Sequence, residues 1–204
     1  SEVIDAVADR LAYWRPATVV LDPVMVAKSG HRLLDDSAVA SLRDRLLPAA
    51  TIVTPNLPEA AVLLDEAPAA SLEAMHGVAE RVYGLGAAAV VLKGGHLGGP
   101  DASDVLYDGR ETNVLSARRV DTANTHGTGC TLSSAIAVLE PRASTLEQAV
   151  RGAKRYLTAA LEDRFLATLD SQVVQAGEVG RLDERQLEGV VAVGQALTVE
   201  RPVV

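Results

Sequence analysis

Three polar residues with catalytic potential each follow a short run of apolar residues that is rich in β-branched side chains. They are Asp22 after residues 18–21, Asn56 after residues 51–53, and Lys93 after residues 88–92. Such runs are typical of buried strands in a parallel sheet, and parallel strands place their carboxyl ends at one edge, where open α/β proteins bind ligands. We therefore expect a carboxylate, an amide and an ammonium group to meet at that edge. Alternatively, the prolines and glycines beside these residues could do no more than end the strands. This alternative is weaker because three such segments each carry a polar residue.

A glycine-containing turn supplies a further group of candidate residues. Gly127 and Gly129 lie just before an apolar helical pattern, so that backbone N–H groups can converge there on an anion. Cys130 would lie in the first helical turn, where the pKa of a thiol is lowered, although a single cysteine is more often a small core residue. The turn matches neither a P-loop nor a dinucleotide fingerprint, because no Gly-Lys-Ser/Thr occurs and position 132 is leucine where the fingerprint needs its third glycine.

The scarcity of lysine draws attention to Lys93. The chain has only three lysines, at positions 28, 93 and 154, so arginine carries most of its positive charge. A compact ammonium group beside two glycines suits a phosphate as a point-charge ligand. An ordinary surface lysine is the alternative interpretation.

The elements that must position these residues alternate between strand-like runs and helical spacing. Helical spacing of apolar residues occurs at residues 3–14, 36–47, 57–65, 71–84, 131–139 and 144–166. This alternation predicts an α/β fold whose parallel sheet is covered by helices. Residues 104–107 and 111–120, joined by Asp108-Gly109, predict an antiparallel hairpin at the sheet.

Composition excludes several classes of protein. The chain has 204 residues, of which 48% are hydrophobic and 23% charged, with one cysteine and a formal net charge of −8. A single cysteine excludes a disulfide within the chain and zinc sites built on several cysteines. The acidic balance argues against nucleic acid as a partner, and no apolar run approaches the roughly 20 residues of a membrane span. We therefore expect a cytoplasmic globular domain that binds neither nucleic acid nor membrane.

Four strings of residues resemble a known enzyme family. They are DPVMVAKSG at 22–30, TPNLPEA at 54–60, KGGH at 93–96 and THGTGCTLS at 125–133. In this order and with this spacing they resemble hydroxymethylpyrimidine/phosphomethylpyrimidine kinase of thiamine biosynthesis, a member of the ribokinase-like superfamily, over about residues 1–160. The resemblance implies a three-layer α/β sandwich with a mostly parallel sheet. Pyridoxal-type kinases share the fold and the Gly-x-Gly anion site, and they are the alternative within the class.

The resemblance also implies ATP as a co-substrate and a role for each residue of the glycine turn. The backbone amides of Gly127, Thr128, Gly129 and Cys130 would form the anion hole for the transferred phosphoryl group. Cys130 would accept or orient the proton of the substrate hydroxymethyl group, a task that a thiolate can perform.

Further roles concern nucleotide, metal and substrate. By resemblance, Lys93, Thr125 and His126 would contact the nucleotide. For His126 we favour a local capping or hydrogen-bonding role over titration in catalysis. Asn56 and Glu59 would organise Mg²⁺ and its waters, with help from Asp22. Val24 would pack on the pyrimidine ring. Residues on the hairpin and on the helix near Ala149, Val150 and Ala153 would flank the adenine.

The chain departs from the family at both ends. Family members carry a longer segment before the first helix, so we expect residues 1–165 to form a partial kinase domain without the N-terminal strands. Such a sheet would have unpaired edges. Residues 166–204 form a tail of uncertain structure. A truncated, non-catalytic nucleotide-binding or interaction protein is therefore a third hypothesis, and the sequence leaves a homo-oligomer open.

Overall fold

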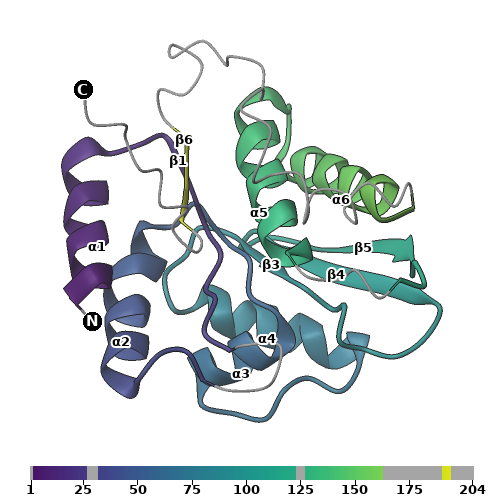
Figure 1. The fold of residues 1–204 in the computed structure, drawn as a ribbon, viewed down its shortest axis with the longest axis horizontal. Coiled ribbons are helices and arrows are strands. Elements are labelled where there is room, and N and C mark those ends of the chain that lie inside the picture. The colour runs from purple at the N-terminus through teal and green to yellow at the C-terminus, as the bar shows by residue number, and fades with distance from the viewer. Residues whose placement is uncertain (1, 27–31, 123–126, 163–189, 194–204) are drawn as a thin grey trace, which may run out of the picture.

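The computed structural model describes residues 2–26, 32–122 and 127–162, together with the backbone of residues 190–193. They form three layers, in which one mixed sheet lies between two groups of helices (Figure 1). The strand order is β5-β4-β3-β2-β1-β6. The strands are β1 (Thr18–Leu21), β2 (Ile52–Val53), β3 (Val90–Leu92), β4 (Asp101–Tyr107), β5 (Thr112–Arg118) and β6 (Val190–Val193).

The sheet combines a parallel centre with an antiparallel edge. β1 pairs in parallel with β2 and β6, and β2 pairs in parallel with β3. The predicted hairpin is confirmed as β4 and β5, which extend the sheet from β3 in antiparallel fashion. The edge of β1 that we expected to be unpaired is lined by β6, a short apolar run in the tail. The rest of the segment 163–204 lies outside the described residues.

Helices cover both faces of the sheet, as the alternating pattern predicts. They are α1 (Glu2–Trp14), α2 (Asp36–Ser41), α3 (Leu57–Leu64), α4 (Leu72–Tyr83), α5 (Thr128–Leu139) and α6 (Leu146–Glu162). α1 to α4 lie on one face, and α5 and α6 lie on the other (Figure 1). Among the described residues, no helix is both long and apolar enough to cross a membrane.

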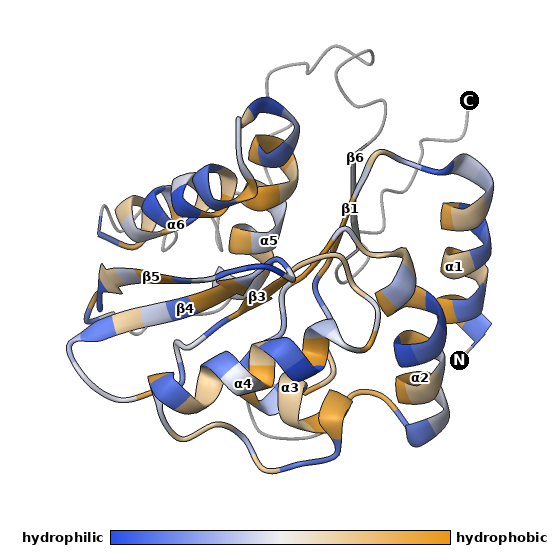
Figure 2. Cartoon of the chain, turned by 180° about the vertical axis from the view of Figure 1, so that it is seen from behind, coloured by the Kyte–Doolittle hydropathy of each residue, from blue (hydrophilic) through white to orange (hydrophobic). Residues whose placement is uncertain are grey.

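Two buried clusters, one on each face, hold the layers together. Along β1, Val19 and Leu21 pack toward α1 to α4, whereas Val20 packs toward α5 and α6. All four residues of β1 are buried, because a central parallel strand has helices on both sides. Figure 2 shows the resulting apolar colour of the central strands and of the helix faces turned toward them.

Some helix boundaries differ from the predicted ones. The predicted helix 36–47 continues from α2 through a π-helical turn at Leu42–Leu46 and a 3₁₀ turn at Leu47–Ala49. Pro48 lacks the N–H that a regular helix would need at that point, so the regular hydrogen-bond ladder cannot continue. The predicted helix 131–139 begins earlier, at Thr128, because Gly127 has the left-handed φ of 76° that turns the chain into it. α6 begins at Leu146 and is described as far as Glu162.

Candidate active site

The carboxyl ends of β1, β2 and β3 come together as the sequence predicts. The Lys93 ammonium lies 2.8 Å from the Asp22 carboxylate across the end of the sheet. Asn56 and Lys93 form an isolated parallel bridge, in which the Lys93 N–H donates to the Pro55 carbonyl at 2.8 Å. Asp22, Asn56 and Lys93 therefore occupy one site.

The Lys93–Asp22 ion pair is shielded from solvent. The exposed fractions of the two side chains are 13% for Lys93 and 3% for Asp22. The interpretation of Lys93 as an ordinary surface lysine is therefore wrong. An ammonium group held in such a place interacts with a bound anion more strongly than one in water, because solvent screens it less.

The N-terminus of α5 lies directly against this ion pair. A Cβ atom built on Gly129 would be 3.0 Å from the Lys93 ammonium nitrogen and 3.9 Å from the second oxygen of Asp22. A side chain at position 129 would therefore displace the lysine. The backbone N–H groups of a helix start and a lysine ammonium together attract phosphate strongly. The predicted residues Gly127, Thr128, Gly129 and Cys130 thus lie at the site, whereas Thr125 and His126 lie outside the described residues.

Two hydroxyl groups that the sequence analysis did not single out attach α5 to the sheet. The Thr54 hydroxyl lies 2.8 Å from the Ser133 hydroxyl, and Ser133 donates in turn to the Gly129 carbonyl at 3.0 Å. The Thr54 hydroxyl also lies 3.3 Å from the Asp22 carboxylate. Both hydroxyl residues occur within the recognised strings, but only the fold shows that they face each other.

Cys130 occupies the predicted place with an unexpected ionisation. Cys130 is exposed at the start of α5, so it is not a core residue. We expected the helix start to lower the pKa of the thiol, and this expectation is wrong. Partial burial raises the pKa of Cys130, and the adjacent carboxylate of Asp22 raises it further by charge repulsion and by accepting a hydrogen bond from the thiol. Lys93 opposes this shift to a smaller degree.

Asn56 and Glu59 begin α3 as a reciprocal capping box. The Asn56 side chain accepts from the Glu59 N–H at 2.9 Å, and the Glu59 carboxylate accepts from the Asn56 N–H at 2.7 Å. Only 3% of Glu59 is exposed. Burial raises the pKa of Glu59 to about 7, against the opposing effect of the Lys93 charge. The N-x-x-E pattern therefore has a structural role in this chain besides any role toward a metal.

Glu59 gives the folded chain a distinctive pH dependence. Its pKa rises from 4.5 to about 7 on folding, so the folded state favours the protonated carboxyl. The contribution of Glu59 to the free energy of unfolding is therefore complete below pH 4.5. It falls by on the order of 3 kcal/mol as the pH rises from 4.5 through 7. We expect Glu59→Gln, which cannot ionise, to gain stability relative to the unchanged chain between pH 5 and pH 8. Urea unfolding at both pH values measures this, and a pH-independent difference would contradict the raised pKa.

The described residues do not provide a complete set of metal ligands. No group of three or more histidine, cysteine or acidic side chains in the part of the chain that the structure describes is arranged to hold a metal ion. One oxygen of Asp22 is taken by Lys93, and one oxygen of Glu59 by the capping box. Mg²⁺ usually keeps several waters and binds through one or two carboxylates and substrate phosphates, which is the kind of binding that these two acids can support.

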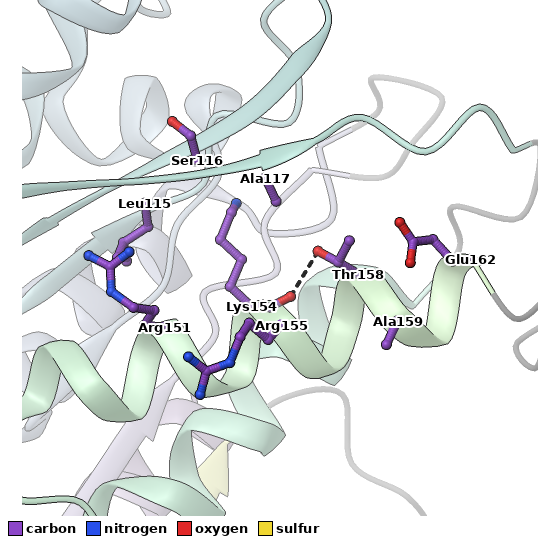
Figure 3. Close-up of a pocket in the computed structure, with 9 residues that line it drawn as sticks. All are labelled: Leu115, Ser116, Ala117, Arg151, Lys154, Arg155, Thr158, Ala159 and Glu162. Carbon is purple, nitrogen blue, oxygen red and sulfur yellow. Dashed lines mark hydrogen bonds between the residues drawn. The ribbon is translucent and has the colours of Figure 1, made fainter.

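A cavity of about 420 Å³ lies between β5 and α6 (Figure 3). It is lined by Leu115, Ser116, Ala117, Arg151, Lys154, Arg155, Thr158, Ala159 and Glu162. β5 runs in the same direction as β3, so the end of β5 that lines the cavity lies at the same sheet edge as Lys93. Ala149, Val150 and Ala153 are themselves buried in the core below α6, so they do not line this cavity. That residues on the hairpin and on the helix near them flank the adenine stays a prediction.

Val24 is half-buried just beyond β1, two residues from Asp22. Met25 beside it is fully buried in the cluster that packs on α1 to α4. Val24 therefore lies close to the ion pair along the chain, and its contact with a pyrimidine ring stays a prediction.

Comparison with known proteins identifies similar sequences and structures. Residues 1–174 match the family described as phosphomethylpyrimidine kinase. The hydroxymethylpyrimidine/phosphomethylpyrimidine kinase of Escherichia coli K12 is 46% identical over 161 residues, which cover 79% of this chain and 60% of that protein. The chain thus spans about 60% of the length of three curated kinases that it matches and 33% of the bifunctional thiamine biosynthesis protein of Geobacter sulfurreducens.

Solved structures agree with the sequence match. The phosphomethylpyrimidine kinase of Clostridium difficile 630 superposes with a TM-score of 0.67 at 35% identity, over 78% of this chain and 64% of that one. The pyridoxal kinase of Staphylococcus aureus in complex with AMP-PCP superposes with a TM-score of 0.73 at 31% identity, over 78% of this chain and 58% of that one. The three-layer ribokinase-like architecture is therefore confirmed.

Proposed function

Because the chain belongs to the phosphomethylpyrimidine kinase family, we propose that it carries the phosphoryl-transfer site of an ATP-dependent kinase acting on 4-amino-5-hydroxymethyl-2-methylpyrimidine and its monophosphate. The observation that carries the proposal is the Lys93 ammonium, largely shielded from solvent, against the glycine-containing start of α5. An ammonium group and a row of backbone N–H groups can bind a phosphate at one point without any covalent chemistry. We place this reaction in the cytoplasm.

The reaction requires little more from the protein than positioning and charge stabilisation. The oxygen of the substrate hydroxymethyl group attacks the terminal phosphorus of ATP, and the bond from that phosphorus to the ADP oxygen breaks. The N–H groups of residues 127–130 and the Lys93 ammonium stabilise the charge on the transferring group. The hydroxyl proton passes to the thiolate form of Cys130, which lies beside Asp22 at the same helix start.

Mg²⁺ would supply charge neutralisation between the phosphates of ATP. Asp22 and Glu59 are the residues of this chain that would hold it, through its waters and together with the phosphates. Both carboxylates already accept hydrogen bonds, Asp22 from Lys93 and the Cys130 thiol and Glu59 from the backbone of Asn56 and Met25, so they would act mainly on the waters of Mg²⁺.

The cavity between β5 and α6 is the proposed place of the adenosine part of ATP. It lies at the sheet edge of Lys93, and a volume of about 420 Å³ is in the usual range for a small-molecule pocket. In Figure 3 the guanidinium group of Arg151, which also pairs with Glu147, lies beside Leu115 at the cavity, where it can meet phosphate or ribose oxygens.

A pyridoxal-type kinase is the second candidate. The observation that favours it is the superposition on the pyridoxal kinases of Staphylococcus aureus, including one in complex with AMP-PCP and pyridoxal, with TM-scores of 0.72 and 0.73. A chain that binds nucleotide without transferring phosphate is the third candidate, since the chain spans only part of its relatives.

Release of ADP distinguishes the three candidates. The chain is incubated with ATP and Mg²⁺, first with hydroxymethylpyrimidine and then with pyridoxal, and ADP is measured against a sample without acceptor. We expect ADP release that depends on hydroxymethylpyrimidine. Release with pyridoxal alone supports the second candidate, and binding of ATP without release in either sample supports the third.

A further inference from the structure

A second buried ion pair lies behind the site, between the hairpin and α6. The Lys154 ammonium is 2.5 Å from one carboxylate oxygen of Asp104, and the exposed fractions of the two side chains are 10% and 9%. Lys154 reaches this position from α6 toward the sheet, as Figure 3 shows. Neither residue lies in the strings that identify the family, and neither has been given a role in the reaction above.

Asp104 connects this pair to the chain segment that carries Lys93. Its other carboxylate oxygen accepts a hydrogen bond from the Gly94 N–H at 2.9 Å. Gly94 lies so close to β4 that a Cβ atom there would be 2.0 Å from the Ser103 carbonyl oxygen. The backbone directly after Lys93 is thus pressed against the hairpin and bonded to a carboxylate whose orientation Lys154 fixes.

Lys93 is held on its other side by the neighbouring strand. Its N–H donates to the Pro55 carbonyl at 2.8 Å, so the Lys93 backbone is fixed between the end of β2 and the Asp104 carboxylate. The direction in which the Lys93 side chain leaves the backbone, toward Asp22 and α5, depends on both attachments. A buried ion pair adds little net stability compared with apolar residues of similar size, so stability alone does not account for this arrangement.

We propose that Asp104, oriented by Lys154, is a positioning residue that directs the Lys93 ammonium toward the phosphate site. The inference rests on the proposed phosphate-binding role of Lys93. In this proposal, the hairpin and α6 border the proposed adenosine cavity and also fix the position of Lys93 beside the terminal phosphate of ATP.

Two double variants separate the effect of the hydrogen bond that positions Lys93 from the effect of the Asp104–Lys154 ion pair itself. Asp104→Asn with Lys154→Met removes both charges but leaves an amide oxygen for the Gly94 N–H. Asp104→Leu with Lys154→Met removes the charges and the acceptor together. We expect the leucine variant to lose about 10- to 100-fold in kcat, as small misplacements of catalytic groups do, with the KM for the pyrimidine little changed. The asparagine variant should recover most of this loss.

A measurement without turnover tests the same point. The three lysines of the chain give resolvable side-chain ammonium signals by NMR after ¹⁵N-lysine labelling, and Lys93→Met assigns the signal of Lys93. We expect that signal to stay in place in the asparagine variant and to shift in the leucine variant. Identical Lys93 signals and identical kcat in the two variants would overturn the inference.

Controls keep the result separate from folding and from the proposed function. Arg81→Met with Glu66→Gln removes an exposed ion pair of 2.7 Å and should change neither readout. Thermal unfolding is followed for every variant, and Asp104→Ser with Lys154→Met replaces the leucine variant if that one does not fold. A shifted Lys93 signal in a chain that never releases ADP would refute the proposed kinase activity and leave the positioning role supported.

Discussion

Replacing Lys93 with methionine is expected to lower kcat for phosphoryl transfer by about 10²- to 10³-fold, the usual cost of removing one preorganised electrostatic group. Lys93 is shielded from solvent, and its ammonium lies beside the helix start where the phosphate is proposed to bind. Methionine has a similar length and no charge, so it tests the charge rather than the volume. Steady-state ADP release at saturating ATP measures the loss, and a decrease of less than about threefold would contradict the proposed role.

The same substitution leaves the Asp22 carboxylate buried without its partner, which typically costs about 3–5 kcal/mol of folding stability. A loss of activity must therefore be separated from a loss of folded protein. Lys93→Met combined with Asp22→Asn removes both charges and restores the balance of the site. If this double variant is folded at the assay temperature but equally inactive, unfolding is excluded as the cause, and Asp22→Asn alone measures how much of the loss belongs to Asp22.

Lys93→Arg is the sharper control for geometry. It preserves the positive charge, but a guanidinium group is larger than an ammonium, and the position of a Cβ on Gly129 is only 3.0 Å from the Lys93 nitrogen. We expect arginine to recover less than a tenth of the activity that methionine loses. Full recovery would show that the site needs a charge but not this close approach.

The position of Lys93 could be predicted because it follows from topology. Parallel strands end at one edge, so any polar residue that directly follows a buried run must come to the same place as the others. Asp22, Asn56 and Lys93 satisfy this rule, and no distance had to be known. The strings that resemble the family suggested which enzyme these positions belong to. That the three residues lie close together could be predicted from the order of strands and helices alone.

The ionisation of Cys130 could not be predicted in this way. Its place in the chain shows a helix start, which lowers the pKa of a thiol, but it does not show that Asp22 lies against the sulfur. The N-x-x-E pattern of Asn56 and Glu59 was ambiguous for a related reason, because a metal site and a capping box need the same spacing. Only the hydrogen bonds of the folded chain distinguish these uses.

Asp104 and Lys154 were missed because no local signal joins them. They are 50 residues apart, on a hairpin and on a helix, and each alone resembles an ordinary surface charge. The available signal was indirect: Lys154 is one of only three lysines, and Asp104 opens the apolar stretch of its strand. Contacts between distant elements depend on how the hairpin turns back along the sheet, which residue patterns do not encode.

Cys130→Ala is expected to lower kcat by about 10²- to 10⁴-fold, the usual contribution of a general base. The raised pKa of the thiol adds a sharper expectation, because only the thiolate can accept a proton. In the unchanged chain the rate should rise with pH through the neutral range and level off only above the usual pKa of a cysteine. The rate of hydroxymethylpyrimidine phosphorylation between pH 6 and pH 10 measures this.

Cys130→Asp tests whether the pH dependence of the rate comes from ionisation of the residue at position 130. Aspartate at this position is repelled by Asp22, which raises the pKa of its carboxyl, but that pKa still starts far below the pKa of a thiol. Activity in this variant should therefore reach its plateau at lower pH than in the unchanged chain, while Cys130→Ser should stay nearly inactive because a hydroxyl does not ionise in this range. If the alanine variant keeps the full rate, or if the profile with aspartate matches that with cysteine, the proton leaves by another route. Asp22, which already accepts a hydrogen bond from the thiol, is then the acceptor to test next.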